Sequence, residues 1–198
     1  MDSSFFAMLS RMKYISRWAL MRNTERETLS EHSLETAVIA HALAVLRNTR
    51  FGGSVSPERV ALLAIFHDAP EILTGDMPTP VKYYSPGLRS AYHEVERAAG
   101  ERLLAMLPDD LRPAYSSLLL DSDEGEEHRL VKAADKLCAL IKCIEERKAG
   151  NLEFVSAENA SRASLEDMAL PEADVFMREF LPAYSLTLDQ QGGPASAE

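Results

Sequence analysis

The chain has 198 residues and a formal net charge of −10, with 46% hydrophobic and 26% charged residues. This composition is typical of a folded globular protein and excludes disordered and fibrous classes. The acidic surplus argues against a nucleic-acid polymer as partner, because binding to a phosphate backbone needs an excess of Lys and Arg. A small phosphorylated ligand needs only one or two local cations, so the composition does not exclude it.

The two cysteines, Cys138 and Cys143, cannot form a disulfide framework, and we interpret them as small thiols in the core or on the surface. The longest wholly apolar run is Val60–Phe66, far short of the roughly 20 residues that a membrane span requires. The amino terminus lacks the cationic start and apolar stretch of a secretory signal. We therefore expect a cytoplasmic protein with no membrane association.

The apolar spacing is helical along almost the whole chain, which predicts an all-α fold. The first two predicted helices are Phe5–Ile15 and Glu31–Leu46, and capping residues precede the second. The second helix has two apolar stripes on nearly opposite sides, so we expect it to pack between neighbours, with His32 beginning a buried element. One stripe consists of Leu34, Val38, His41 and Val45, and we interpret His41 as a hydrogen-bonded core residue.

A third helix is predicted to begin at Ser56–Pro57, a capping residue followed by a proline at the first helical position, and to run towards Leu73. Pro70 removes one backbone hydrogen bond inside this pattern, so we expect a kink where the polar residues cluster. A loop with two prolines and a glycine follows over Thr74–Pro80.

The remaining chain is also predicted to be helical, near residues 88–107, 109–120, 124–149, 157–168 and 171–181. We assign residues 1–188 to a single domain. Residues 189–198 are rich in Gly, Pro, Ala and Ser and are predicted to form a disordered tail.

Five polar groups stand on or beside apolar helical segments: His32, His67, Asp68, Glu71 and Asp135. Imidazole and carboxylate groups from separate helices form a suitable shell for one divalent transition ion, such as Zn, Co, Ni, Fe or Mn. The lack of thiolates among them argues against a closed structural zinc site. Asp135 lies at the edge of an apolar helix face, where a lone buried charge would cost several kcal/mol.

Each of these residues also has an ordinary interpretation. Asp68 alone could be a helix-surface residue, and Asp135 could pair with Lys132 or Lys136 on its own helix. The adjacent pair His67–Asp68 follows a long apolar helix, and another His and another Asp stand on flanking helices. This combination favours a metal site.

The order His32, His67–Asp68, Asp135 resembles the H…HD…D signature of the HD-domain phosphohydrolases, an all-helical metal-dependent superfamily. Within that superfamily the chain is most similar to the bacterial HD-domain 5′-deoxynucleotidases, in order from about Phe5 to Leu188. The likeness is carried by Ser16–Trp18, Met21–Asn23, Ser30–Ser33, His67–Glu71 and Leu73–Lys82.

This resemblance implies an HD-domain helical bundle that hydrolyses deoxyribonucleoside 5′-monophosphates to the deoxyribonucleoside and phosphate. It implies a homodimer and a divalent transition metal ion, with cobalt favoured. The metal ligands that it implies are His32, His67, Asp68 and Asp135, of which His32, Asp68 and Asp135 would also contact the substrate.

The resemblance also assigns roles around the metal. Arg17 and Trp18 would hold and orient the phosphate, which makes Trp18 part of the catalytic set together with the carboxylate of Glu71. The sugar side of the substrate would be lined by Asp76, Met77, Pro78 and Thr79.

Elementary chemistry is compatible with these roles. A bound divalent ion lowers the pKa of water and polarises a phosphoryl oxygen. Glu71 is one helical turn beyond His67, so it can face the same cleft as a general acid or base. The planar fork of Arg17 suits a phosphate dianion, although an arginine alone is as often a surface ion pair. Asp76 could accept a hydrogen bond from a sugar hydroxyl or simply form a turn.

Two alternatives remain at this level. The first is an HD phosphohydrolase for another phosphate, such as a nucleoside triphosphate, a cyclic dinucleotide or an alarmone. The few additional cations near the motifs, Arg22 and Lys82, favour the less charged monophosphate. The second is a catalytically silent binding protein, against which the intact ligand set and Glu71 argue.

Overall fold

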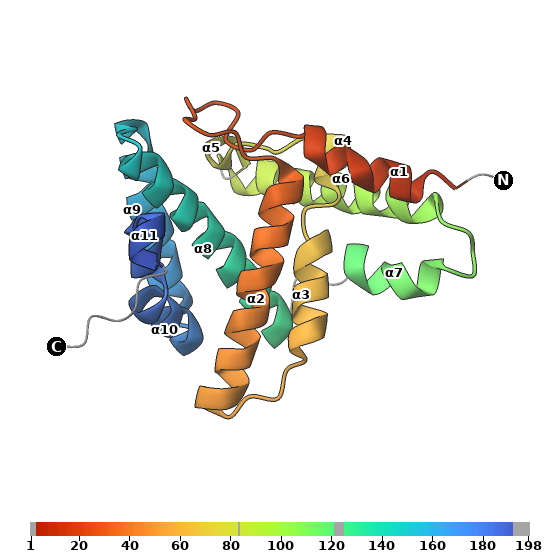
Figure 1. Cartoon of the computed structure of the whole chain (residues 1–198). Coiled ribbons are helices and arrows are strands. Elements are labelled where there is room, and N and C mark those ends of the chain that lie inside the picture. Colours follow the sequence, from red (N-terminus) through yellow and green to blue (C-terminus); the bar gives the residue numbers. More distant parts are fainter. Residues whose placement is uncertain (1–2, 83, 121–124, 192–198) are drawn as a thin grey trace.

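The computed structural model describes residues 3–82, 84–120 and 125–191, which fold into helices without a strand (Figure 1). In chain order the α-helices (α) and 3₁₀ helices (η) are α1 (Phe5–Leu9), η1 (Ser10–Tyr14), α2 (Leu29–Phe51), α3 (Pro57–Phe66), α4 (Glu71–Thr74), α5 (Thr79–Lys82), α6 (Pro86–Ala105), α7 (Arg112–Leu119), α8 (Glu126–Lys148), η2 (Leu152–Phe154), α9 (Val155–Met168), α10 (Pro171–Glu179), η3 (Leu181–Ser185) and α11 (Leu188–Gln191). The all-α prediction is confirmed.

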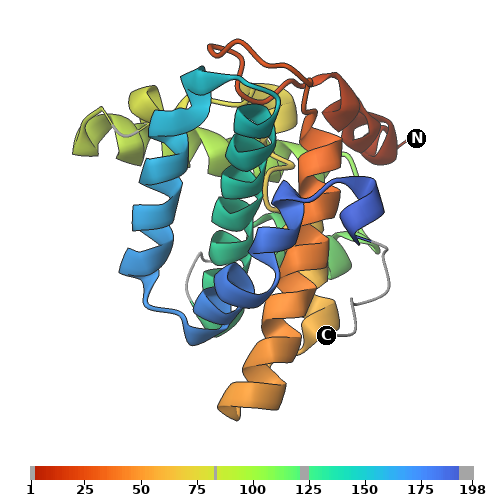
Figure 2. The same cartoon turned by 60° about the vertical axis from the view of Figure 1, so that its left-hand side comes forward.

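The centre of the molecule is formed by α2, α3 and α8. Figure 1 shows α3 beside α2 with α8 crossing behind them, and Figure 2 shows α9 running beside α8. Fully buried side chains such as Leu43, Val60 and Leu137 fill the space between these helices. Cys138 and Cys143 are both buried and are free thiols.

Local sequence fixes where α2 begins and ends. Thr28 and Glu31 form a capping box, in which the Thr28 hydroxyl accepts from the Glu31 backbone N–H and the Glu31 carboxylate accepts from the Thr28 backbone N–H. The helix ends at Gly52, whose φ of 69° lies in the left-handed region that glycine tolerates. This start places His32 in the first turn of α2, at the end of the helix that faces the site.

A second, smaller core lies under α6, which crosses the end of the central helices in Figure 1. It is built from Phe5 of α1, Ala69 of the turn after α3, Leu103 of α6, Leu107 just after α6, and Leu119 of α7. Its packing holds the turn between α3 and α4 in place, and that turn carries His67 and Asp68.

The structure corrects several predicted boundaries. The first helix divides into α1 and η1 and ends at Tyr14, and α5 begins inside the predicted loop at Thr79. The predicted kink at Pro70 is a complete break, because α3 ends at Phe66 and α4 begins at Glu71. Of the predicted tail, residues 189–191 belong to α11 and residues 192–198 lie outside the described residues, as does Glu124 at the predicted start of α8.

The outer stripe of α2 is also corrected. Leu34 and Val38 are both 64% exposed, and His41 is exposed as well, so His41 is not a core residue. The packed neighbours of α2 meet its other side, through residues such as Ile39 and Leu43. A helix with two apolar stripes therefore does not always lie between neighbours within its own chain.

A buried carboxylate near the end of α8 fixes the segment that precedes α2. Glu146 accepts hydrogen bonds from the backbone N–H groups of Thr24 (2.8 Å) and Glu25 (3.2 Å) and from the Asn151 side chain (2.8 Å), and it pairs with Lys142 at 2.5 Å. Burial alone would raise the pKa of Glu146, but these donors hold it well below its usual range. The loop before α2 is thereby tied to the central helix.

Within the part of the chain that the structure describes, no helix is both long and apolar enough to cross a bilayer.

Candidate active site

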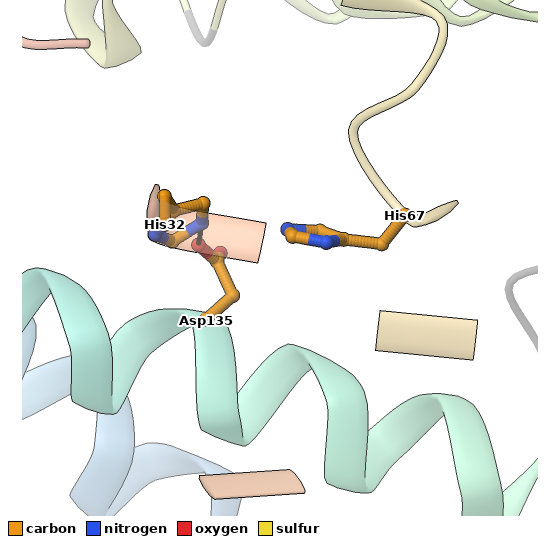
Figure 3. Close-up of side chains that lie close together, drawn as sticks. All are labelled: His32, His67 and Asp135. Atoms are coloured by element: carbon orange, nitrogen blue, oxygen red, sulfur yellow. Dashed lines mark ion pairs between the residues drawn. The ribbon is translucent and has the colours of Figure 1, made fainter. Parts of the chain in front are cut away.

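Three helices bring two imidazoles and a carboxylate together at one end of the bundle. His32 lies in the first turn of α2, His67 directly follows α3, and Asp135 lies on α8. Their potential ligand atoms all lie within 4.8 Å of one another, and His32 Nε2 is 3.1 Å from Asp135 Oδ1 (Figure 3). Figure 3 shows His67 pointing towards the other two side chains. This is the spacing of side chains that can share one ion.

Asp68 borders this group. Its Oδ2 lies 3.1 Å from His67 Nε2 and 3.6 Å from His32 Nε2. The break in the helix at Pro70 allows this, because His67 and Asp68 stand in a turn rather than on successive faces of a continuous helix. The structure thus brings together all four residues predicted as metal ligands.

The hydrogen bonding of His67 tests whether a metal fits. Its Nδ1 lies 2.7 Å from the carbonyl oxygen of Ala64, which can only accept, so Nδ1 carries a proton. In the neutral ring Nε2 then has a lone pair, and this buried atom has no hydrogen-bond partner among the described residues. Nε2 and the Asp68 carboxylate oxygen 3.1 Å away are both able to bind a shared cation. The residues fit a divalent ion, with His67 held as metal-binding histidines usually are.

The charges around the candidate metal ligands also favour a bound cation. Burial alone would raise the pKa of Asp68 and of Asp135, but the nearby His67, His32 and Arg17 side chains hold both pKa values well below their usual range. Burial and Arg17 oppose protonation of His32, yet the Asp135 and Glu27 carboxylates raise its pKa to about 9. The site therefore attracts positive charge to the point where His32 and Asp135 meet.

Arg17 lies against the same carboxylates. Its Nη1 is 3.1 Å from Asp68 Oδ2, its Nη2 is 3.7 Å from Asp135 Oδ1, and its Nε is 3.4 Å from Glu27 Oε2. The guanidinium is mostly buried, and it is a cation fixed at the edge of the candidate metal group.

Trp18 connects Arg17 to the loop after α4. Its indole N–H donates to Glu27 Oε2 at 2.7 Å, its backbone N–H donates to Asp76 Oδ2 at 3.2 Å, and its ring packs on Phe154 with centroids 5.3 Å apart. Its φ is 58°, a left-handed conformation that is rare and strained for a residue with a bulky side chain. These contacts hold Trp18 in that conformation and place Asp76 close to it.

Glu71 is the first residue of α4 and is only 6% exposed. Burial, together with the neighbouring Asp68 and Asp76 carboxylates, raises the pKa of Glu71 to about 9. Its Oε2 is buried without a hydrogen-bond partner in the described part of the chain. Burial and these two carboxylates therefore favour the protonated form of Glu71.

The other predicted site residues follow Asp76. Met77 and Pro78 are partly buried in the loop between α4 and α5, and Thr79 begins α5, with its side chain outside what the structure describes. Sequence reasoning missed Glu27, which contacts Arg17, Trp18 and His32. No periodic or motif signal surrounds it, so its role is visible only in three dimensions.

The chain folds like proteins of known structure. It superposes on an HD-domain phosphohydrolase from Listeria innocua with a TM-score of 0.81 and 26% identity, over 91% of this chain and 88% of that one. The fold is also that of an HD phosphohydrolase from cyanophage S-2L, DatZ, bound to dA and one catalytic Zn²⁺ ion, with a TM-score of 0.63 and 17% identity over 91% and 96% of the two chains. Fold and site together define an HD-domain phosphohydrolase.

Sequence comparison narrows this class. The family model described as 5′-deoxynucleotidase YfbR-like matches residues 4–184. The chain is 50% identical to a 5′-deoxynucleotidase of Erwinia tasmaniensis, over 95% of this chain and 96% of that protein, and 49% identical to 5′-deoxynucleotidase YfbR of Escherichia coli, over 96% of each. The chain belongs to the YfbR-like 5′-deoxynucleotidase family.

Proposed function

We propose that this enzyme removes the phosphate from deoxyribonucleoside 5′-monophosphates in a reaction that requires a divalent metal ion. Family membership and the near full-length likeness to proteins named 5′-deoxynucleotidase support the substrate class. The observation that carries the chemistry is the meeting of a candidate metal group, a fixed arginine and a buried protonated carboxyl group in one site.

We assign the metal to His32, His67, Asp68 and Asp135, where a bound ion would polarise a phosphoryl oxygen and lower the pKa of water. Arg17 then binds the phosphate, because its Nη atoms face the same carboxylates that hold the metal. The left-handed conformation of Trp18 fixes the backbone beside Arg17 and so orients this contact.

Glu71 is proposed to donate the proton that the departing 5′-oxygen needs. Its raised pKa keeps the proton on the carboxyl group at neutral pH, which is the state that a general acid requires. Burial of the side chain keeps bulk water from taking over this role.

The sugar side is assigned to the loop after α4. Asp76 lies beside the Trp18 backbone, and one carboxylate oxygen accepts the Trp18 N–H. We propose that the other oxygen accepts a hydrogen bond from the sugar 3′-hydroxyl, with Met77, Pro78 and Thr79 lining the same side. A ribose would bring an additional 2′-hydroxyl to this loop.

A phosphate-release panel tests the function. Deoxyribonucleoside 5′-monophosphates are expected to release inorganic phosphate with added Co²⁺, and Mn²⁺, Zn²⁺ and Mg²⁺ are compared in parallel to establish which metal supports turnover best. Chelation should abolish release, and matched ribonucleotides should react more slowly. Preferential hydrolysis of nucleoside triphosphates with release of pyrophosphate or triphosphate would contradict the proposed substrate. We propose cobalt as the most active metal because the family resemblance favours it, while the imidazole and carboxylate donors themselves accept several transition ions.

We further propose that the enzyme is a cytoplasmic homodimer that buries the exposed stripe of α2. Leu34 and Val38, both 64% exposed, are large apolar side chains in the middle of this stripe. Light scattering at micromolar concentration should give a dimer mass, and Val38→Glu should give a monomer because it places a charge in the interface. A monomer mass for the unaltered chain would remove this proposal.

The free buried thiols are compatible with a reducing compartment.

A further inference from the structure

Glu27 stands between the phosphate side and the metal side of the site. It precedes α2, is only 8% exposed, and its two carboxylate oxygens face different partners. Oε2 accepts the Trp18 indole N–H at 2.7 Å and lies 3.4 Å from Arg17 Nε, while Oε1 lies 3.6 Å from His32 Nδ1. One side chain thus contacts three residues that have separate roles in the proposed reaction.

The contact with Arg17 determines how its fork is aimed. The Arg17 backbone N–H donates to the Glu27 carbonyl oxygen at 3.0 Å, and the Nε side of the guanidinium faces the Glu27 carboxylate. Glu27 therefore binds Arg17 by a backbone hydrogen bond and by an ion pair at Nε, which makes no hydrogen bond in the described part of the chain. With Nε directed towards Glu27, Nη1 and Nη2 are directed to the carboxylates of Asp68 and Asp135. That is the side on which a phosphate would bind.

The contact with His32 orients its imidazole ring. Nδ1 faces the Glu27 carboxylate, and Nε2 faces Asp135 at 3.1 Å and Asp68 at 3.6 Å. The Glu27 carboxylate on the Nδ1 side therefore favours the ring orientation in which Nε2 faces Asp68 and Asp135, where it could bind a metal.

We propose that Glu27 is a positioning residue. It orients the Arg17 guanidinium, the Trp18 indole and the His32 ring, so that the phosphate and the metal are held at fixed positions relative to each other. The expected change in KM rests on the proposed function. The expected changes in metal affinity and in Trp18 fluorescence do not depend on which phosphate is the substrate.

The test variant is Glu27→Gln, with Glu25→Gln as the matched control. Glutamine has the size of glutamate and can still accept the Trp18 indole N–H, but it presents no charge to Arg17 and His32. Glu25 lies in the same loop with an exposed side chain, so its variant makes the same charge change outside the site. Circular dichroism and thermal melting establish that each variant is folded.

Three measurements on the folded variants decide the matter. For Glu27→Gln, the dissociation constant for Co²⁺ by titration calorimetry is expected to rise about 10- to 100-fold, the usual effect of losing a partner of a metal-binding histidine. The KM for a deoxyribonucleoside monophosphate is expected to rise about tenfold even at saturating metal, because the Arg17 fork is no longer aimed. Trp18 is the sole tryptophan of the chain, so intrinsic fluorescence reports its environment directly. We expect Co²⁺ to change this fluorescence in the control, and we expect Glu27→Gln to show no such change at Co²⁺ concentrations that saturate the control.

The outcomes separate the two proposals. Metal affinity, KM and fluorescence response equal to those of Glu25→Gln would overturn the positioning role of Glu27. A wild-type enzyme that releases no phosphate from deoxynucleotides would overturn the proposed function, while the calorimetry and fluorescence would still test Glu27. If Glu27→Gln does not fold, Glu27→Asp keeps the charge but shortens the reach by one methylene, and wild-type metal affinity in that variant would equally contradict the proposal.

Discussion

Replacing Glu71 with alanine is expected to lower kcat by at least about a hundredfold while metal content and nucleotide binding are retained. The Glu71 backbone N–H donates to the Asp68 carbonyl oxygen at 2.9 Å, but Glu71 is not needed to complete a shell of two imidazoles and two carboxylates. General acid–base catalysis contributes roughly 10²- to 10⁴-fold, or about 3–5 kcal/mol of barrier. Metal stoichiometry and kcat measured on one preparation provide the test.

Glu71→Gln is the matched variant, because it preserves the size and burial of the side chain but has no carboxyl proton to transfer. The sign of the pH effect follows from the raised pKa of Glu71. The protonated form is the proposed acid, so wild-type kcat should decline as pH rises through that pKa, and the residual activity of Glu71→Gln should lack this decline. Near-normal turnover in both variants would exclude a proton role. Loss of the metal would instead make Glu71 a metal ligand.

Asp135→Ala is expected to abolish both metal binding and turnover. Asp135 is the one predicted ligand contributed by α8, and its Oδ1 lies 3.1 Å from His32 Nε2. Its removal takes away a charged donor and also leaves His32 and Arg17 without one of their carboxylate partners. Metal analysis after gentle purification and the phosphate-release assay measure the two losses.

Asp110→Ala is a suitable control for this variant, since Asp110 is exposed before α7 and outside the site. Circular dichroism should show that Asp135→Ala is still helical, because the core around α8 is formed by apolar residues such as Leu137 and Ile141. An Asp135→Ala enzyme that kept its ion and its rate would show that Asp135 serves only in ion pairs.

The sequence predicted the helices and the meeting of the site residues better than it predicted what faces solvent. Pro70 after the pair His67–Asp68 predicted a kink with ligands beside it, because proline acts locally on the backbone, although the structure shows a complete break there. The prediction that His41 and its apolar neighbours on α2 are buried is wrong. An apolar stripe indicates that a helix face favours burial, but it does not indicate whether the same chain or another chain packs against it. The roles of the individual site residues remain predictions.

The contacts of Glu27 could not be predicted from the sequence either, and the reason differs from that for His41. Its partners are fixed by how the chain turns between η1 and α2, including the left-handed residue Trp18. No spacing rule covers such a segment, because its geometry comes from contacts with α8 and with the loop after α4. The turn also depends on Glu146, which is more than a hundred residues away along the chain.

The attachment of that loop to Glu146 has a consequence for how the protein opens. Thr24 and Glu25 donate their backbone N–H groups to a buried carboxylate on the central helix rather than to water. Local unfolding of the loop would leave this carboxylate and Lys142 without several of their partners in the interior, so the loop should open only together with the end of α8. Slow hydrogen exchange at these two amides would place the loop before α2 in the same cooperative unit as the end of α8, whereas surface loops usually exchange first.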